Sequence, residues 1–125
     1  MISLKQSGNF EKTKKFLEKA KKANYIRILE RYGREGVAAL AAATPVDSGL
    51  TARSWSYEIR VNRYSYTLIW KNSNIINGVP IAIIIQYGHG TRNGGYVEGQ
   101  DYINPAMKPI FNKMAREIWR EVTAL

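Results

Sequence analysis

The stretch Thr44-Pro45-Val46-Asp47-Ser48-Gly49-Leu50 decides the fold of this chain, because it separates a helical half from a half that begins with strands. Before it, residues 37–43 are mostly alanine, with one leucine and one valine, and alanine and leucine favour helix. Pro45 has no backbone N–H and disfavours helical angles at Thr44, so the helix should end there. Turn-forming residues follow, and we expect Gly49 to adopt a left-handed backbone conformation.

Beyond this turn, apolar and polar residues alternate, which is the pattern of strands. Residues 54–61 and 64–71 each place an apolar or aromatic side chain at every second position. Asn62 and Arg63 lie between the two runs and are expected to form a two-residue hairpin turn. Residues 72–78 have the composition of a loop.

The N-terminal part predicts a loose arm over residues 1–8 and a basic helix over residues 9–24, capped by Asn9. The helix has a thin apolar stripe, made of Phe10, Thr13, Phe16, Leu17 and Ala20. The stripe is too narrow for a core helix and too apolar to remain in water. We therefore expect this helix to dock on a neighbouring subunit.

A second helix is predicted over residues 25–43. Gly33 and Gly36 lie on its apolar face, although each glycine costs about 1 kcal/mol in a helix relative to alanine. The two glycines either let another part of the chain approach closely or mark a break near Gly33. The sequence leaves both alternatives open.

The C-terminal part is more ambiguous. Residues 79–87 contain four isoleucines, which favour a buried strand, but Pro80 and Gly88 favour a short helix, which we prefer. The glycine-rich residues 88–99 are expected to lack regular structure. Asn104 and Pro105 are expected to open the last element, a helix carried mainly by residues 109–122. Because Pro109 lies too deep for a regular start at Pro105, we expect a separate first turn.

Together these patterns predict an α+β fold with N-terminal helices, a small antiparallel sheet and a C-terminal helix packed on the sheet. A length of 125 residues predicts a single domain over residues 1–125. The absence of cysteine excludes disulfides and thiolate metal sites. We expect no membrane span and a cytoplasm-like setting, because no run is apolar and long enough for a span or a signal peptide.

The charge is strongly positive and uneven. Nineteen Lys and Arg oppose ten Asp and Glu, a net charge of +9. Between Lys5 and Glu35 there are ten basic and four acidic residues, which leaves +6 of that charge in this segment. The block is either a solvated helix face or part of a nucleic-acid-binding module. The candidate contacts of such a module are Lys12, Lys15, Lys19 and Lys22.

Candidate catalytic chemistry rests on one histidine. His89, with Thr91 and either Asp101 or Glu98, has the residue types of a nucleophile–base–acid set, so a small hydrolase or nuclease is an alternative. We expect instead that His89 is a dispensable loop residue. We expect no metal and no cofactor, because ligand residues are not clustered and the glycine-rich segment lacks the Gly-Lys-Ser/Thr end of a phosphate-binding loop.

Three short motifs resemble those of one protein family. Pro45-Val46-Asp47-Ser48-Gly49, with Ser54 following, resembles the Pro-Val-Asp-Thr/Ser-Gly box of the tail-completion, or head–tail joining, proteins of tailed bacteriophages and prophages. Gln86-Tyr87-Gly88, followed by Thr91, resembles the family's Glu-aromatic-Gly-Thr box. Asn104-Pro105-Ala106 resembles its Pro-Ala box before the closing helix. The order of elements also matches beyond about the first 20 residues.

The chain departs from the family pattern at three places. Thr51 stands where the family has leucine, Gln86 stands for the usual glutamate, and His89-Gly90 is inserted before Thr91. The resemblance implies a structural, non-enzymatic protein of the virion neck, assembled in the host cytoplasm. The box residues would fix turns of the fold rather than carry chemistry.

The resemblance also implies the partners. The chain would form a homo-oligomeric ring, for which we expect a hexamer, and would contact the tail tube or tail terminator and the head-connector proteins. DNA would be a partner only as it passes through the ring. The candidate interface residues are Phe10, Phe16, Leu17, His89 and Arg92.

Overall fold

The computed structural model describes residues 2–7, 15–45 and 49–124, with side chains described for 21–45 and 49–124. In chain order, the elements are β1 Ile2–Ser7, α1 Lys15–Ala43, α2 Gly49–Arg53, β2 Trp55–Val61, β3 Ser65–Asn72, β4 Ile75–Ile76, β5 Val79–Pro80, α3 Ile81–Tyr87, β6 Gly88–Gly90, β7 Tyr96–Glu98 and α4 Ile103–Thr123. The fold is α+β, as the sequence predicts.

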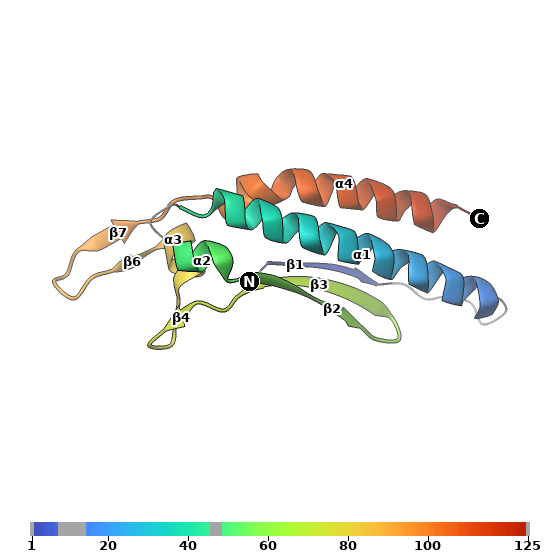
Figure 1. Cartoon of the computed structure of the whole chain (residues 1–125), viewed down its shortest axis with the longest axis horizontal. Coiled ribbons are helices and arrows are strands. Elements are labelled where there is room, and N and C mark those ends of the chain that lie inside the picture. The colour runs from blue at the N-terminus through green and yellow to red at the C-terminus, as the bar shows by residue number, and fades with distance from the viewer. Residues whose placement is uncertain (1, 8–14, 46–48, 125) are drawn as a thin grey trace.

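Two long helices cover one face of an antiparallel three-stranded sheet, and together they make an elongated body (Figure 1). The strand order is β1-β3-β2, so β3 is central. Helices α1 and α4 run antiparallel, because the start of α1 meets the end of α4: Lys21 Nζ donates to the carbonyl of Glu121 at 3.0 Å. Short hairpins and α3 extend from one end of this body.

Strand β1 occupies a segment that the sequence analysis assigned to a loose arm. Ile2–Ser7 pair with β3, in a register that matches Ile2 with Trp70 and Ser7 with Ser65. The pairing gives the central strand a neighbour on both edges. Residues 2–5 alternate apolar with polar, the period-two signal of a strand.

Helix α1 is one continuous helix of 29 residues, about 43 Å long, rather than the two predicted helices. It passes through both glycines without a break, so the close-approach alternative is confirmed. A Cβ atom on Gly33 would lie 2.5 Å from the ring of Tyr57, and one on Gly36 would lie 2.4 Å from the indole of Trp70. The two aromatic side chains of the sheet therefore lie directly on the backbone of α1.

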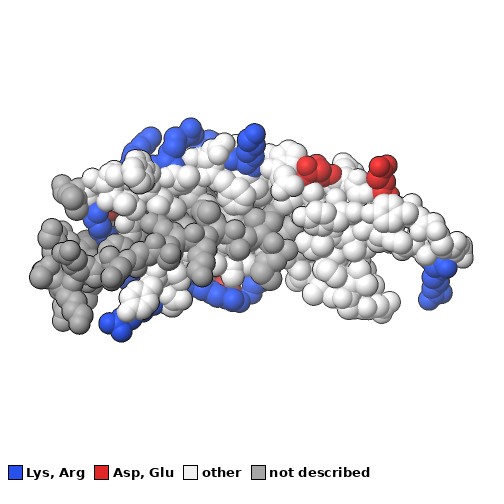
Figure 2. Space-filling model, turned by 180° about the vertical axis from the view of Figure 1, so that it is seen from behind, with Lys and Arg blue, Asp and Glu red and all other residues white. Residues whose placement is uncertain are grey.

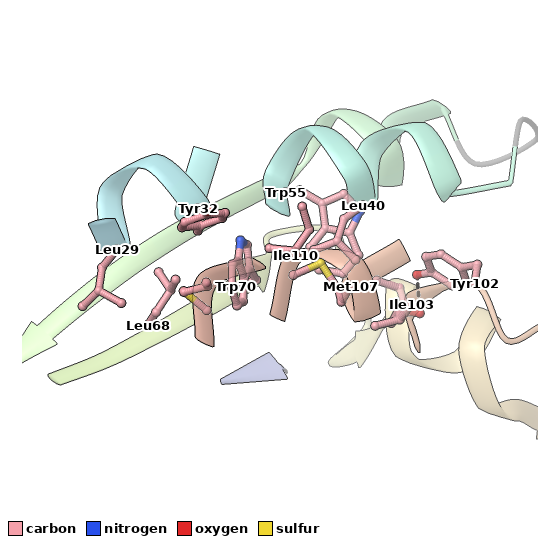
Figure 3. Close-up of a cluster of buried hydrophobic side chains, with 12 residues drawn as sticks. Leu29, Tyr32, Leu40, Trp55, Leu68, Trp70, Tyr102, Ile103, Met107 and Ile110 are labelled. Carbon is pink, nitrogen blue, oxygen red and sulfur yellow. Dashed lines mark hydrogen bonds between the residues drawn. The ribbon is translucent and has the colours of Figure 1, made fainter. Parts of the chain in front are cut away.

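The core lies between this helical layer and the sheet (Figure 3). Strands β2 and β3 contribute alternating residues, with Trp70 and Leu68 fully buried. Helix α4 contributes Met107 and Met114, and Phe111 packs edge-on against Trp70 at 5.9 Å between ring centroids. The amphipathic patterns of strand and helix thus converge on one buried cluster.

The opposite sheet face carries charged pairs on β2 and β3, together with Ile69, which is buried. Lys71 donates to Glu58 at 2.7 Å, and Arg60 pairs with the other oxygen of the same carboxylate. Hydrogen bonds from Lys71 and then Arg60 lower the pKa of Glu58 below its ordinary value. These exposed pairs keep the outer face hydrated.

The junction after α1 is held by a buried hydrogen-bond chain. Thr44 Oγ1 donates to the carbonyl of Leu40 at 2.6 Å and accepts from Trp55 Nε1 at 3.0 Å. This links the end of the helix to the first residue of β2, so the helix ends where predicted. The prediction for Gly49 is wrong: the residue starts α2 and is not among the glycines with positive φ. The five-residue helix α2 stands immediately before β2.

The predicted strands at 54–61 and 64–71 are present with ends shifted by one residue. The hairpin turn is also shifted: the N–H of Asn62 donates to the carbonyl of Ser65, which leaves Arg63 and Tyr64 as the central pair. The side-chain oxygen of Asn62 accepts from the N–H groups of Tyr64 and Ser65 at 2.9 and 2.8 Å. These two bonds replace the missing glycine as the device that closes the turn.

Two further hairpins lie in segments predicted to be loops. Strands β4 and β5 flank Asn77 and Gly78, which have positive φ values of 50° and 76°, as a type I′ turn requires. Strands β6 and β7 lie within the glycine-rich segment, and Gly88 pairs with Glu98. The prediction of irregular structure over 88–99 is therefore wrong.

The helices of the C-terminal half agree in part with the predictions. Helix α3 is the short helix preferred for residues 79–87, preceded by Pro80 and followed by Gly88. Helix α4 starts at Ile103 and continues through Pro109, so the expected separate first turn is wrong. Both Pro105 and Pro109 are exposed, so the carbonyl that Pro109 leaves without a partner can be hydrated.

The contact between α1 and the sheet gives a test. Gly36→Ala should destabilise the fold by about 1–3 kcal/mol, because Trp70 is fully buried and cannot yield to a new methyl group. Helix propensity alone would make the Gly36→Ala protein more stable, by about 1 kcal/mol. Urea unfolding followed by circular dichroism measures the difference.

The matched control is Ala38→Gly on the exposed side of the same helix, which should cost about 1 kcal/mol through propensity alone. A more stable Gly36→Ala protein would contradict the close approach of Trp70 to the helix.

Candidate assembly surface

The end of the body opposite the β2–β3 turn carries a hairpin–helix–hairpin unit (Figure 1). Strand β5 runs directly into α3, which runs directly into β6. We call residues 75–99, which contain both hairpins and α3, the hairpin end. The first hairpin places Ile75 and Ile76 in solvent, 58% and 52% exposed. The same region also exposes the large apolar side chains of Val79, Tyr87, Tyr96 and Val97, and the nearby helix α2 exposes Leu50.

This surface is poor in charge. Among residues 75–99 the charged side chains are Arg92 and Glu98, in a chain of net charge +9. Figure 2 shows the contrast: Lys and Arg gather along both margins of the body, whereas the hairpin end on the right carries a blue side chain at its tip and its lower projection is uncharged. An exposed, apolar and uncharged surface is costly in water and typical of a protein–protein contact.

The base of the first hairpin is fixed by a network around Thr51. Thr51 is 1% exposed; its Oγ1 accepts from Asn74 Nδ2 at 2.8 Å, and its carbonyl accepts from Asn72 Nδ2 at 2.8 Å. The carbonyl of Asn74 accepts from the N–H of Ile81, the first residue of α3. Thr51 thus holds the segment that enters the hairpin, and Asn74 joins that segment to the start of α3.

The base of the second hairpin is fixed by Gln86, which is buried. Its Oε1 accepts from the N–H groups of Tyr102 and Ile103 at 3.0 and 2.9 Å, and so satisfies donors at the start of α4. Its Nε2 donates to Asp101 Oδ1 at 2.6 Å. A glutamine suits this position because it accepts from the helix and donates to the carboxylate at once.

Tyr102 completes this contact between α3 and α4. Its hydroxyl donates to the carbonyl of Ala82 at 2.7 Å (Figure 3). Burial raises the pKa of Tyr102 to about 12, so the hydroxyl remains a donor at neutral pH. Tyr102 therefore joins the start of α3 to the beginning of α4, and Gln86 joins the end of α3 to the same place.

The second hairpin leaves α3 through two glycines in close contact. Gly88 has a φ of +82°, and a Cβ there would lie 2.5 Å from the carbonyl oxygen of Val97. A Cβ on Gly99 would lie 2.5 Å from the carbonyl oxygen of Gln86. The Tyr96 hydroxyl donates to the carbonyl of Tyr87 at 2.8 Å. The glycine of the second family-like box is thus required by the crossing of two chain segments.

The structure places the motif residues at turns and helix starts. The Gln86-Tyr87-Gly88 box forms the end of α3, and Pro105 and Ala106 lie in the first turns of α4, which Gln86 caps. Thr91 is in the loop of the second hairpin, where its N–H donates to the carbonyl of Gly95 at 2.9 Å. Of the first box, Pro45 follows α1 and Gly49 starts α2, while Val46, Asp47 and Ser48 lie outside the described residues.

The candidate interface residues separate into two groups. His89 and Arg92 are exposed on the second hairpin and belong to the hairpin end. Phe10 lies outside the described residues, and so do the side chains of Phe16 and Leu17. The segment that carries them is not a separate helix: residues 15–24 are the first turns of α1, where Asn24 donates to Glu121 at 2.8 Å.

The sequence analysis missed the residues of the first hairpin. Ile75, Ile76 and Val79 surround Asn77-Gly78, and this dipeptide between apolar residues is the strongest short-range signal of a hairpin. Composition alone suggested a loop. The Asn77-Gly78 pair, by contrast, predicts the hairpin that the structure contains.

Among the described residues, the structure shows no hydrogen-bonded set of catalytic side chains around His89. His89 is exposed and pairs with Val97 in the hairpin, and none of its side-chain atoms is hydrogen-bonded to Thr91, Glu98 or Asp101. In the same part of the chain, no group of three His, Asp or Glu side chains is placed to hold a metal ion. None of the helices described combines the length and apolar composition needed to cross a bilayer.

The Gln86 contact can be tested by placing a glutamate at this position. Gln86→Glu should destabilise the protein by about 1–3 kcal/mol at pH 7, because it places a second carboxylate against Asp101. Repulsion raises the pKa of one carboxyl of the pair, so the loss should shrink as the pH falls towards 4. Thermal unfolding between pH 4 and 8 measures both effects.

The matched control is Gln86→Glu combined with Asp101→Asn, which restores a donor–acceptor pair and should recover most of the stability. Equal loss in the single and double variants would show that the Gln86–Asp101 bond is unimportant.

No family model matches the sequence, and the comparisons with curated proteins and with solved structures give no match either.

Proposed function

We propose that the chain is a structural subunit of a bacteriophage neck or tail end, and that it forms a ring that completes the tail or joins it to the head. The proposal combines the motif resemblance with one structural observation, the exposed apolar hairpin end. Its work is assembly and involves no bond-making chemistry.

The observation that carries the proposal is the exposure of Ile75 and Ile76 on a rigid hairpin. Two adjacent isoleucines at more than half exposure are unfavourable in a monomer. Burying the exposed half of each on a partner contributes about 0.8–1.5 kcal/mol, half of the value for a full side chain. The Thr51 network and the Gln86 contact hold the hairpin end in place, so little conformational entropy is lost on docking.

The location of the surface favours a ring. The hairpin end lies at one extremity of an elongated subunit (Figure 1). When such a surface docks on a different part of the next copy, the contact is head-to-tail, and repeating it closes a ring if the rotation permits. His89 and Arg92, on the second hairpin, would lie in the same contact.

The test is the assembly state of Ile75→Ser combined with Ile76→Ser, measured by light scattering and electron microscopy. We expect rings for the unmodified chain, alone or with its tail-tube partner. The double variant should weaken assembly by at least about tenfold, because it removes two apolar contacts worth more than 1.4 kcal/mol together. Its free energy of unfolding should fall by no more than about 1–2 kcal/mol, since both side chains are already more than half exposed.

The matched control is Val61→Ser with Tyr64→Ser, which removes two exposed apolar side chains at the opposite end of the body. The control should assemble normally. Equal loss in both variants, or a monomer in the presence of tail partners, would overturn the proposal.

A further inference from the structure

The outer face of α4 carries cations and no acid. Its core face is formed by Ile103, Met107, Ile110 and Met114, which are buried. Four basic residues of the helix are exposed: Lys108, Lys113, Arg116 and Arg120. With 3.6 residues per turn, the last three follow one stripe along the helix. Figure 2 shows Lys and Arg along the margin of the molecule that α4 occupies in Figure 1.

The two acids of α4 are turned towards α1. Glu117 pairs with Arg31, and Glu121 accepts a hydrogen bond from Asn24 at 2.8 Å. These carboxylates are therefore engaged inside the subunit and do not neutralise the outer stripe. The face is left with a local positive charge that attracts an anionic surface.

An exposed tryptophan lies within this basic face. Trp119 is 67% exposed, whereas the other two tryptophans, Trp55 and Trp70, are 8% and 0% exposed. It follows Arg116 by three positions, so these two side chains are neighbours on the helix surface, at one side of the basic stripe. Tryptophan and arginine together are the composition of interface positions that contribute most to binding.

A second copy of this chain is a poor partner for the face. The chain has ten acids against nineteen cations. Of the described acids, Glu58, Glu117 and Glu121 already accept hydrogen bonds or pair with cations, and Asp101 accepts from Gln86. Among the acids whose side chains are described, this leaves Glu30, Glu35 and Glu98, three carboxylates for the four cations of α4. A different molecule that is richer in acids therefore fits the face better.

A protein suits the face better than duplex DNA does. Phosphates would satisfy the cations, but a duplex with stacked bases offers no apolar pocket to an indole. Burying Trp119 requires a cavity lined by apolar side chains, which a protein surface provides. We propose that the outer face of α4 docks on an acidic protein surface that has an apolar pocket for Trp119. This contact is separate from the hairpin end and holds whether or not the chain forms a ring.

The probe is a short acidic peptide that is amphipathic as a helix, with Leu and Phe on one face and Glu on the other. Polyglutamate, which has the charge without the apolar face, and a short DNA duplex serve as comparison ligands. The readout is the emission wavelength and acrylamide quenching of tryptophan, since Trp119 is the tryptophan that a quencher reaches. Trp119→Phe supplies the background of the two core tryptophans.

We expect the amphipathic peptide to shift the emission to the blue and to protect Trp119 from acrylamide. Trp119→Ser and the pair Arg116→Gln with Arg120→Gln should each weaken this binding by at least about tenfold. The matched control, Arg53→Gln with Arg63→Gln, makes the same charge change on exposed arginines elsewhere and should bind as the unmodified chain does. Polyglutamate should bind more weakly and leave Trp119 open to the quencher.

Three outcomes would overturn the proposal. The first is equal binding of polyglutamate and the amphipathic peptide without protection of Trp119, which would indicate charge alone. The second is unchanged binding by Trp119→Ser, with its fold intact by circular dichroism. The third is protection of Trp119 by the duplex and not by the peptide, with affinity falling steeply with salt, which would assign the face to nucleic acid.

Discussion

The fold depends on the contact of Trp70 with the backbone of α1. The indole lies where Gly36 leaves no side chain, and its N–H donates to the carbonyl of Gly33 at 3.0 Å. The opposite side of the ring system meets Phe111 of α4. One side chain of the central strand therefore joins the sheet to both long helices. Because packed interiors yield little, the spacing of the two layers is set at this point.

Polar contacts hold the hairpin end in place relative to that core. Thr51 and Gln86 are both buried, and each satisfies several donors of neighbouring segments. At both positions the chain departs from the family-like pattern, and at both the structure supplies a matching partner, Asn74 for the threonine and Asp101 for the glutamine.

The sequence correctly predicted those helices and strands that are determined by a few neighbouring residues. The end of α1 at Pro45, the alternation of β2 and β3, and the short α3 before Gly88 all follow from backbone rules that act over a few residues. The fold class followed from their order. Gln86, Pro105 and Ala106 were also expected to act on the fold, and they lie at the α3–α4 junction.

The features that the sequence did not predict depend on contacts between residues far apart in the chain. Whether Gly33 and Gly36 break a helix depends on Trp70 and Tyr57, which come much later in the chain. The pairing of the glycine-rich segment depends on the crossing of Gly88 and Gly99, which glycine content alone does not reveal. The sequence also does not reveal that Glu117 and Glu121 face α1, because their partners Arg31 and Asn24 lie on a helix far away in the chain.

The central position of β3 has a consequence for the order of folding. Strand β2 pairs with it through a two-residue turn, so this hairpin can form as soon as both strands exist. Strand β1 pairs with the same strand, but the whole of α1 lies between them in the sequence. Helix α1 itself packs on α4, and the hydrogen bond from Lys21 to Glu121 joins residues 100 positions apart. Closing such long loops is slow. We expect β1 to join last during folding and to open first when the native state fluctuates, leaving one edge of the sheet transiently free while the hairpin end stays formed.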